Sequence, residues 1–194
     1  MPDERIVAYH ESGHVLAAHA LGQSISTVEL TPTGGEFKSF APTDWETVPE
    51  NREQFRSAVL ASLGPQHIDE MLPTMVSLLA GLAAQRRLVG RTHDDYADAD
   101  MRQCGQISRA VAPGGERELL AHAQGQADRI VAEHWHEIEA VAAELLLHRR
   151  LDAAQITDIV KTASLGPAAR RRRHWEQLVA RAEASGMTLV AREV

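Results

Sequence analysis

Apolar residues at helical spacing are the feature that most constrains how this chain folds. In the first 22 residues they recur three and four positions apart, which predicts a helix that begins near Pro2 and Asp3 and ends at Gly22. The residues on the predicted face are Ile6, Val7, His10, His14, Ala17, Ala18 and Leu21. Similar spacing predicts further helices over residues 51–63, 68–88, 92–111, 116–148, 152–163 and 170–184. Only 4% of the residues are aromatic, so Leu, Ala and Val must build the core.

A short β-element is predicted directly after the first helix. Residues 25–30 are rich in β-branched side chains and roughly alternating, a Gly-rich turn follows, and residues 36–40 form a possible return strand. Gly125 interrupts the longest helical stretch, which is therefore predicted as one helix or as two pieces. The predicted fold class is mainly α, or α+β, with this one small β-element.

Length and charge bound the domain organisation. The 194 residues suit one domain, predicted over 1–165, followed by a basic extension over 166–194 that contains a helix and a short strand at 187–190. The net charge of −7 disfavours nucleic acid as a partner, and a solvated face explains the basic run 170–173 more simply. The single cysteine, Cys104, is predicted to be a small buried hydrophobe and fits a reducing compartment. Without a secretory signal or a long apolar run, we expect a cytoplasmic protein with no membrane span.

The sequence His10-Glu11-Ser12-Gly13-His14 is an H-E-x-x-H motif on the best-defined predicted helix. Residues four apart project from one helix face, so His10 and His14 can reach the same metal ion. Glu11 lies about 100° around the helix, where it can hydrogen-bond a metal-bound water without itself binding the metal. The alternative is two ordinary histidines at the edge of the core.

A catalytic zinc needs a third protein ligand. Glu36 has a spacing that some zinc peptidases use, but it follows a Gly-rich turn and is the weaker choice. An acidic run opens the predicted helix at 92–111, where carboxylates also cap the helix and complement its dipole. We interpret Asp94, Asp98 and Asp100 in that capping sense. The pair His134 and His136 projects about 200° apart on a helix and cannot chelate one ion.

Four segments resemble the peptidase domain of the FtsH-type zinc proteases. Residues 7–15 are similar to that family's A-Y-H-E-A-G-H-A segment, 80–85 to its G-G-R-x-A-E, and 94–100 to its N-D-[IL]-x-x-A-T. Residues 151–156 resemble its closing helical step, so the resemblance covers roughly residues 3–163. It implies a zincin-like helical peptidase domain that binds Zn²⁺ through His10, His14 and Asp95, the last matching the aspartate of the N-D pair.

The implied activity is a zinc-dependent endopeptidase that cleaves unfolded or flexible polypeptides, with Glu11 activating the metal-bound water. The substrate would lie extended against an edge strand at 25–30 or 36–40. Because the family's ATPase and membrane helices are not in this sequence, the implied partners are a separate ATPase or further copies in a hexamer. The chain departs from the family pattern at Leu82, Gln85, Arg91, Thr92 and Asp94. These departures support an alternative, a metal-stabilised binding or regulatory module that cleaves little.

Overall fold

The computed structural model describes residues 3–31, 34–40, 61–90 and 94–165, together with positions 176 and 179. The helix predicted over 51–63 lies almost wholly outside these residues, as do the extension at 166–194 and its short strand. The elements are α1 (Glu4–Ala20), β1 (Ser24–Thr31), β2 (Gly34–Phe40), the 3₁₀ turn η2 (Pro65–His67), α3 (Ile68–Val89), α4 (Asp94–Val111), α5 (Glu116–Glu133), α6 (Trp135–His148), β3 (Arg150–Asp152) and α7 (Ala153–Ala163). The prediction of a mainly α fold with a small sheet is confirmed.

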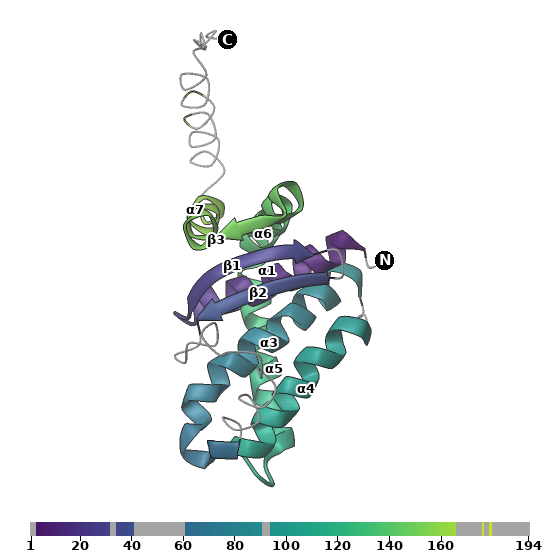
Figure 1. The fold of residues 1–194 in the computed structure, drawn as a ribbon, viewed down its shortest axis with the longest axis vertical. Coiled ribbons are helices and arrows are strands. Elements are labelled where there is room, and N and C mark those ends of the chain that lie inside the picture. Colours follow the sequence, from purple (N-terminus) through teal and green to yellow (C-terminus); the bar gives the residue numbers. More distant parts are fainter. Residues whose placement is uncertain are drawn as a thin grey trace.

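Helix α1 is the centre of the fold. Asp3 caps it by accepting a hydrogen bond from the Arg5 amide at 2.9 Å, and nearly every residue from Ile6 to Ala18 is buried. The helix contacts α3, α6 and both strands of the hairpin. Figure 1 shows α3, α4 and α5 on one side of α1 and the group of α6, β3 and α7 on the other. Burial on all sides explains why this helix carries so few charged residues.

The sheet is antiparallel, with the strand order β2-β1-β3. Val28 at the middle of β1 faces Phe37 on β2 and Leu151 on β3. Strand β3 was not predicted, because a strand of three residues is too short to show alternation. Asp152, its last residue, caps α7 through the reciprocal box with Gln155 that the sequence predicted.

The stretch 116–148 forms two helices, and they separate at His134 and not at Gly125. His134 leaves the helical region with φ −106° and ψ 25°. The bend lets α5 pack on α3 while α6 packs on α1. It also places the Trp135 ring 5.5 Å from that of Tyr9 and 4.7 Å from the Arg87 guanidinium. Gly125 lies within α5, and a Cβ added there would meet open space, so the position carries no packing constraint.

Helices α1 and α3 cross at very short range. A Cβ built on Gly13 would lie 2.5 Å from the Ala80 carbonyl oxygen and 2.9 Å from the Ala84 Cβ. Only small residues allow two helix backbones to approach this closely. The approach brings the backbone of α3 directly against the His-Glu motif of α1.

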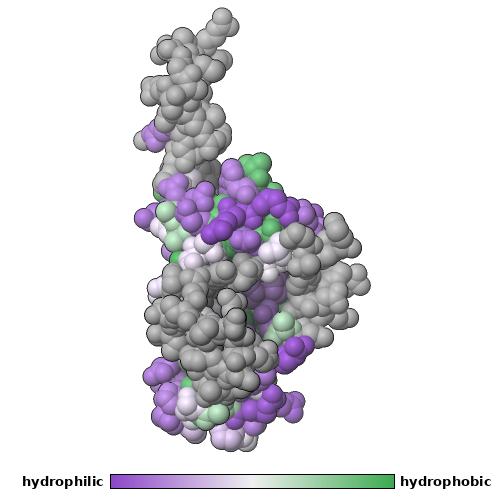
Figure 2. Space-filling model, viewed as in Figure 1, coloured by the Kyte–Doolittle hydropathy of each residue, from purple (hydrophilic) through white to green (hydrophobic). Residues whose placement is uncertain are grey.

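The surface shown in Figure 2 is mainly hydrophilic where the residues are coloured, with isolated hydrophobic spots. Such scattered spots are normal on a protein surface and mark no particular interface. Within the ranges that the structure describes, no helix combines the length and the apolar character that crossing a membrane requires.

Candidate metal centre

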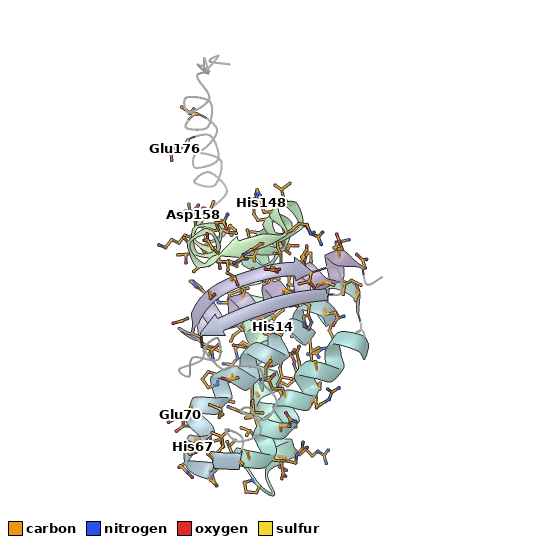
Figure 3. The ribbon with its side chains drawn as sticks, viewed as in Figure 1. His14, His67, Glu70, His148, Asp158 and Glu176 are labelled. Atoms are coloured by element: carbon orange, nitrogen blue, oxygen red, sulfur yellow. The ribbon has the colours of Figure 1, made fainter. Side chains whose placement is uncertain are left out.

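The two histidines of the motif lie together on the buried face of α1. Their Nε2 atoms are 3.0 Å apart and their rings meet edge to face at 88°. His10 is 3% exposed and His14 is 5% exposed. Figure 3 shows His14 below the β1–β2 hairpin, close to the middle of α3 and far from His67 and Glu70 at the start of that helix. One turn of α1 therefore presents two imidazole nitrogens to a single buried point.

The tautomer of His14 follows from its partner on α3. Its Nδ1 atom lies 2.8 Å from the backbone carbonyl oxygen of Ser77. A carbonyl can only accept, so Nδ1 carries a proton, and in the neutral ring Nε2 is left with a lone pair that can bind a metal ion. Metal-binding histidines are typically oriented by this kind of hydrogen bond from the other ring nitrogen.

Asp100 on α4 completes the cluster. Its Oδ2 atom lies 3.1 Å from His10 Nε2 and 3.4 Å from His14 Nε2. Ligand atoms of the three residues all lie within 4.8 Å of one another. The interpretation of Asp100 as a helix-capping residue is wrong, because α4 begins six residues earlier, at Asp94, and the Asp100 carboxylate faces the histidines.

The other acidic residues considered as ligands are not placed by this geometry. The side chains of Asp94, Asp95, Asp98 and Glu36 lie outside the described residues. The assignment of Asp95 as a ligand therefore stays a prediction.

Asp100 is distinguished from the neighbouring aspartates by its register with the buried face of α4. The buried face of α4 contains Cys104, Ile107 and Val111, which are at most 3% exposed. Asp100 lies one turn before Cys104 and extends the same row of buried residues towards the start of the helix. A carboxylate in register with an apolar row faces the core, and it needs a partner there.

The electrostatics of the cluster follow from burial and from the opposite charges. Burial disfavours the charged form of His14, but the Asp100 carboxylate outweighs this and raises the pKa of His14 to about 9. Burial likewise opposes ionisation of Asp100, but the two histidines hold the pKa of its carboxyl far below the ordinary range. The ionised carboxylate is thus the stable form of Asp100 in this site.

Two glycines let backbone approach the motif. A Cβ on Gly81 of α3 would lie 2.5 Å from His14 Cε1 and 3.0 Å from His10 Cε1. A Cβ on Gly35 of β2 would lie 2.5 Å from Glu11 Cδ. Glu11 is itself 4% exposed, so its carboxylate lies between α1 and the hairpin, beside the histidine pair. Neither close approach was predicted, because a glycine alone does not show which atoms it faces.

Gly81→Ala is expected to lower the free energy of unfolding by about 1–3 kcal/mol and to weaken metal binding, because the new methyl group displaces both imidazoles. Gly125→Ala is the matched control, since nothing lies within 4 Å of its Cβ and alanine favours the helix by up to about 1 kcal/mol. Urea unfolding of the two variants measures both effects. Equal stability of Gly81→Ala and the unmodified protein would contradict the packing described.

Without metal, the protein is expected to lose roughly 2 kcal/mol of stability between pH 6.5 and 9. The pKa of His14 is raised on folding, so its contribution is complete below the ordinary value of 6.5 and disappears as the pH rises through about 9. The contribution of Asp100 has the opposite sense, because its lowered pKa makes it complete above the ordinary value of 3.8. Urea unfolding in the presence of chelator measures the change, and Asp100→Asn should remove it. A constant free energy of unfolding over this interval would refute the coupling.

The remaining candidate residues, Cys104, His134 and His136, have structural roles. Cys104 is buried as predicted, its Sγ lies 3.7 Å from the Met75 carbonyl oxygen, and burial raises the pKa of the thiol to about 12. Such a thiol is inert at neutral pH. His134 forms the bend between α5 and α6, and His136 pairs with Glu139 on the surface at 3.5 Å.

The fold and the cluster together define a class: a mainly helical domain with an H-E-x-x-H helix and a group of metal-ligating type made of two buried histidines and one partly buried aspartate. The chain is similar to the ATP-dependent zinc metalloprotease FtsH of Lactococcus lactis subsp. lactis (strain IL1403). The two are 25% identical over 191 residues, which cover 85% of this chain but only 28% of that protein. No protein-family profile matches the chain. The similarity supports a distant relationship to FtsH-like peptidases.

Proposed function

We propose that this chain is a zinc-dependent peptidase domain that cleaves flexible polypeptides, with His10, His14 and Asp100 as metal ligands and Glu11 as general base. The observation that carries the proposal is the convergence of two imidazole nitrogens and one carboxylate oxygen at a buried point next to Glu11. Isolated buried charges are costly, and a divalent cation compensates such a group.

The donor set fits zinc. Two histidine nitrogens and one carboxylate oxygen are common zinc ligands in catalytic sites, which leave the fourth position open. Ligands about 2.0–2.1 Å from a tetrahedral ion lie about 3.3 Å from each other. The three separations here, between the two histidine Nε2 atoms and Asp100 Oδ2, are 3.0, 3.1 and 3.4 Å. The hydrogen bond from His14 Nδ1 to Ser77 supports the same arrangement.

Bound zinc supplies Lewis-acid polarisation of the scissile carbonyl and acidifies a water molecule. Glu11 contributes the proton acceptor. It follows His10 by one residue and so emerges to the side of the imidazole pair, where a carboxylate takes a proton from the attacking water and returns it to the leaving amine. Packing against the Gly35 backbone holds that carboxylate in place.

The sheet topology favours one site for an extended substrate. Strand β1 already has neighbours on both sides, so within the described sheet only β2 and the three-residue β3 have an open edge. β2 is the longer of these two strands and is the one that lies against Glu11. We propose that a polypeptide adds as a further strand to the β2 edge, which requires a locally unfolded substrate. Of the two strands considered from the sequence, this selects the one at 36–40.

Further parts of the proposal have other grounds. A partner ATPase or a hexameric assembly rests on the resemblance alone. A cytoplasmic location and the division into a peptidase domain over 1–165 and a basic extension rest on the composition and the charge distribution of the sequence. Size-exclusion chromatography with light scattering tests the assembly directly.

The deciding experiment measures zinc content and hydrolysis together. We expect one zinc per chain by elemental analysis, cleavage of casein that chelator abolishes, and little cleavage of a stably folded domain. Zinc without cleavage of any flexible substrate would favour the alternative of a metal-stabilised binding module. A protein that binds no zinc and cleaves no substrate would refute both functions.

A further inference from the structure

Gln85 on α3 is a buried polar residue that the proposed chemistry does not use. The residue is 0% exposed, and among the described residues neither its amide nitrogen nor its amide oxygen has a hydrogen-bond partner. Buried amides in native proteins are nearly always hydrogen-bonded, so an exception calls for a specific explanation.

Gln85 lies on the part of α3 that faces the histidines. His14 contacts Ser77 and Gly81, whereas His10 contacts Gly81. Towards the N-terminus of α1, from His14 to His10, the contacts therefore shift towards the C-terminus of α3. The two helices run antiparallel where they touch. Gln85 is one turn beyond Gly81, in the direction in which His10 lies from His14.

The direction of helical side chains brings the amide closer still. Long side chains on a helix lean towards its N-terminus, over the residue one turn earlier. For Gln85 that residue is Gly81, which has no side chain and against which the His10 ring packs. We therefore expect the Gln85 amide to lie on the side of Gly81 against which the His10 ring packs.

We propose that Gln85 is a positioning residue for His10, and that its amide oxygen accepts the Nδ1 proton of that ring when zinc is bound. The inference rests on the proposed function. With zinc bound at Nε2, the neutral His10 ring carries its proton on Nδ1. Helix α3 then orients both imidazoles from one turn on either side of Gly81, His14 through the Ser77 carbonyl and His10 through the Gln85 amide.

The test compares three variants of the full chain. Gln85→Leu keeps the size of the side chain but removes the acceptor, and it should weaken zinc binding about 10–100-fold. Gln85→Glu keeps an acceptor and should stay within about threefold of the unmodified protein. Ser108→Ala is the matched control, because it removes a different buried polar group, the Ser108 hydroxyl on α4. It should not change zinc affinity. Competition with a chromophoric chelator measures the affinities, and circular dichroism checks the fold.

A spectroscopic measurement separates positioning from a purely structural role. In ¹H–¹⁵N spectra of histidine-labelled, zinc-loaded protein, we compare how fast the Nδ1 proton of His10 exchanges with water. Exchange should be slow in the unmodified chain and in Gln85→Glu, and fast in Gln85→Leu. A zinc affinity of Gln85→Leu within threefold of the unmodified protein would overturn this inference and leave the proposed function standing. So would an equal loss of affinity in folded Gln85→Glu. An unmodified protein that binds no zinc would overturn the proposed function as well.

Discussion

Asp100→Asn should weaken zinc binding by more than about 100-fold and should abolish peptidase activity. The substitution removes the carboxylate that lies 3.1 and 3.4 Å from the Nε2 atoms of His10 and His14. Two neutral imidazoles alone make a poor zinc site, because a catalytic site normally has three protein ligands. Competition titration and elemental analysis after dialysis measure the loss.

Asp95→Asn is the decisive comparison, since the resemblance to FtsH-type peptidases assigns the third ligand to Asp95. If Asp100 is the ligand, Asp95→Asn keeps its zinc. The reverse result, with zinc lost in Asp95→Asn and kept in Asp100→Asn, would show that the family register holds and that Asp100 only pairs with the histidines. Asp128→Asn, on the exposed face of α5 beside Arg86, controls for the loss of one negative charge.

Glu11→Gln should retain zinc and fold but lose about 10²–10⁴-fold in kcat/KM on a flexible peptide. Glutamine has the size and shape of glutamate, so it fits the space beside Gly35, but it cannot accept a proton from water. Steady-state hydrolysis of a fluorogenic peptide gives the rate, and elemental analysis gives the zinc content.

Glu29→Gln is the matched control for this prediction. Glu29 lies in the hairpin itself, on β1, and its carboxylate pairs with Arg150 at 3.6 Å on the surface. Surface pairs of this kind contribute little, so the control should keep full activity. Full activity in Glu11→Gln would exclude Glu11 as the base.

The helical part of the fold was predictable because helices follow from the spacing of apolar residues that are close together in the chain. The apolar row of α1, the capping box of α7 and the strand β1 all depend on residues close together in the chain. The errors arose where tertiary packing decides. The helical stretch bends at His134 because α5 and α6 cover different neighbours, and β3 forms because β1 offers an open edge. Neither partner can be read from the segment itself.

The candidate site was predictable to the same extent. His10, Glu11 and His14 are adjacent on one helix, so their spacing alone gives the motif. Asp100 comes from another helix, and four aspartates in seven residues offered rival choices. The continuation of the apolar row through Cys104 distinguishes it only once the buried face of α4 is known. The Ser77 contribution is a backbone carbonyl, which any residue would supply, and so it leaves no trace in the sequence.

The pairing of β1 with β3 has a consequence for the order in which the chain can fold. The residues that meet at the metal centre, from His10 to Asp100, are synthesised well before Arg150–Asp152, which close the sheet against β1. Contacts between such distant segments form late, because the intervening chain must first be confined. We expect the histidine helix to stay incompletely packed on the ribosome until α6 and β3 have emerged. Metal loading during synthesis would then depend on the last quarter of the described chain, which contributes no ligand.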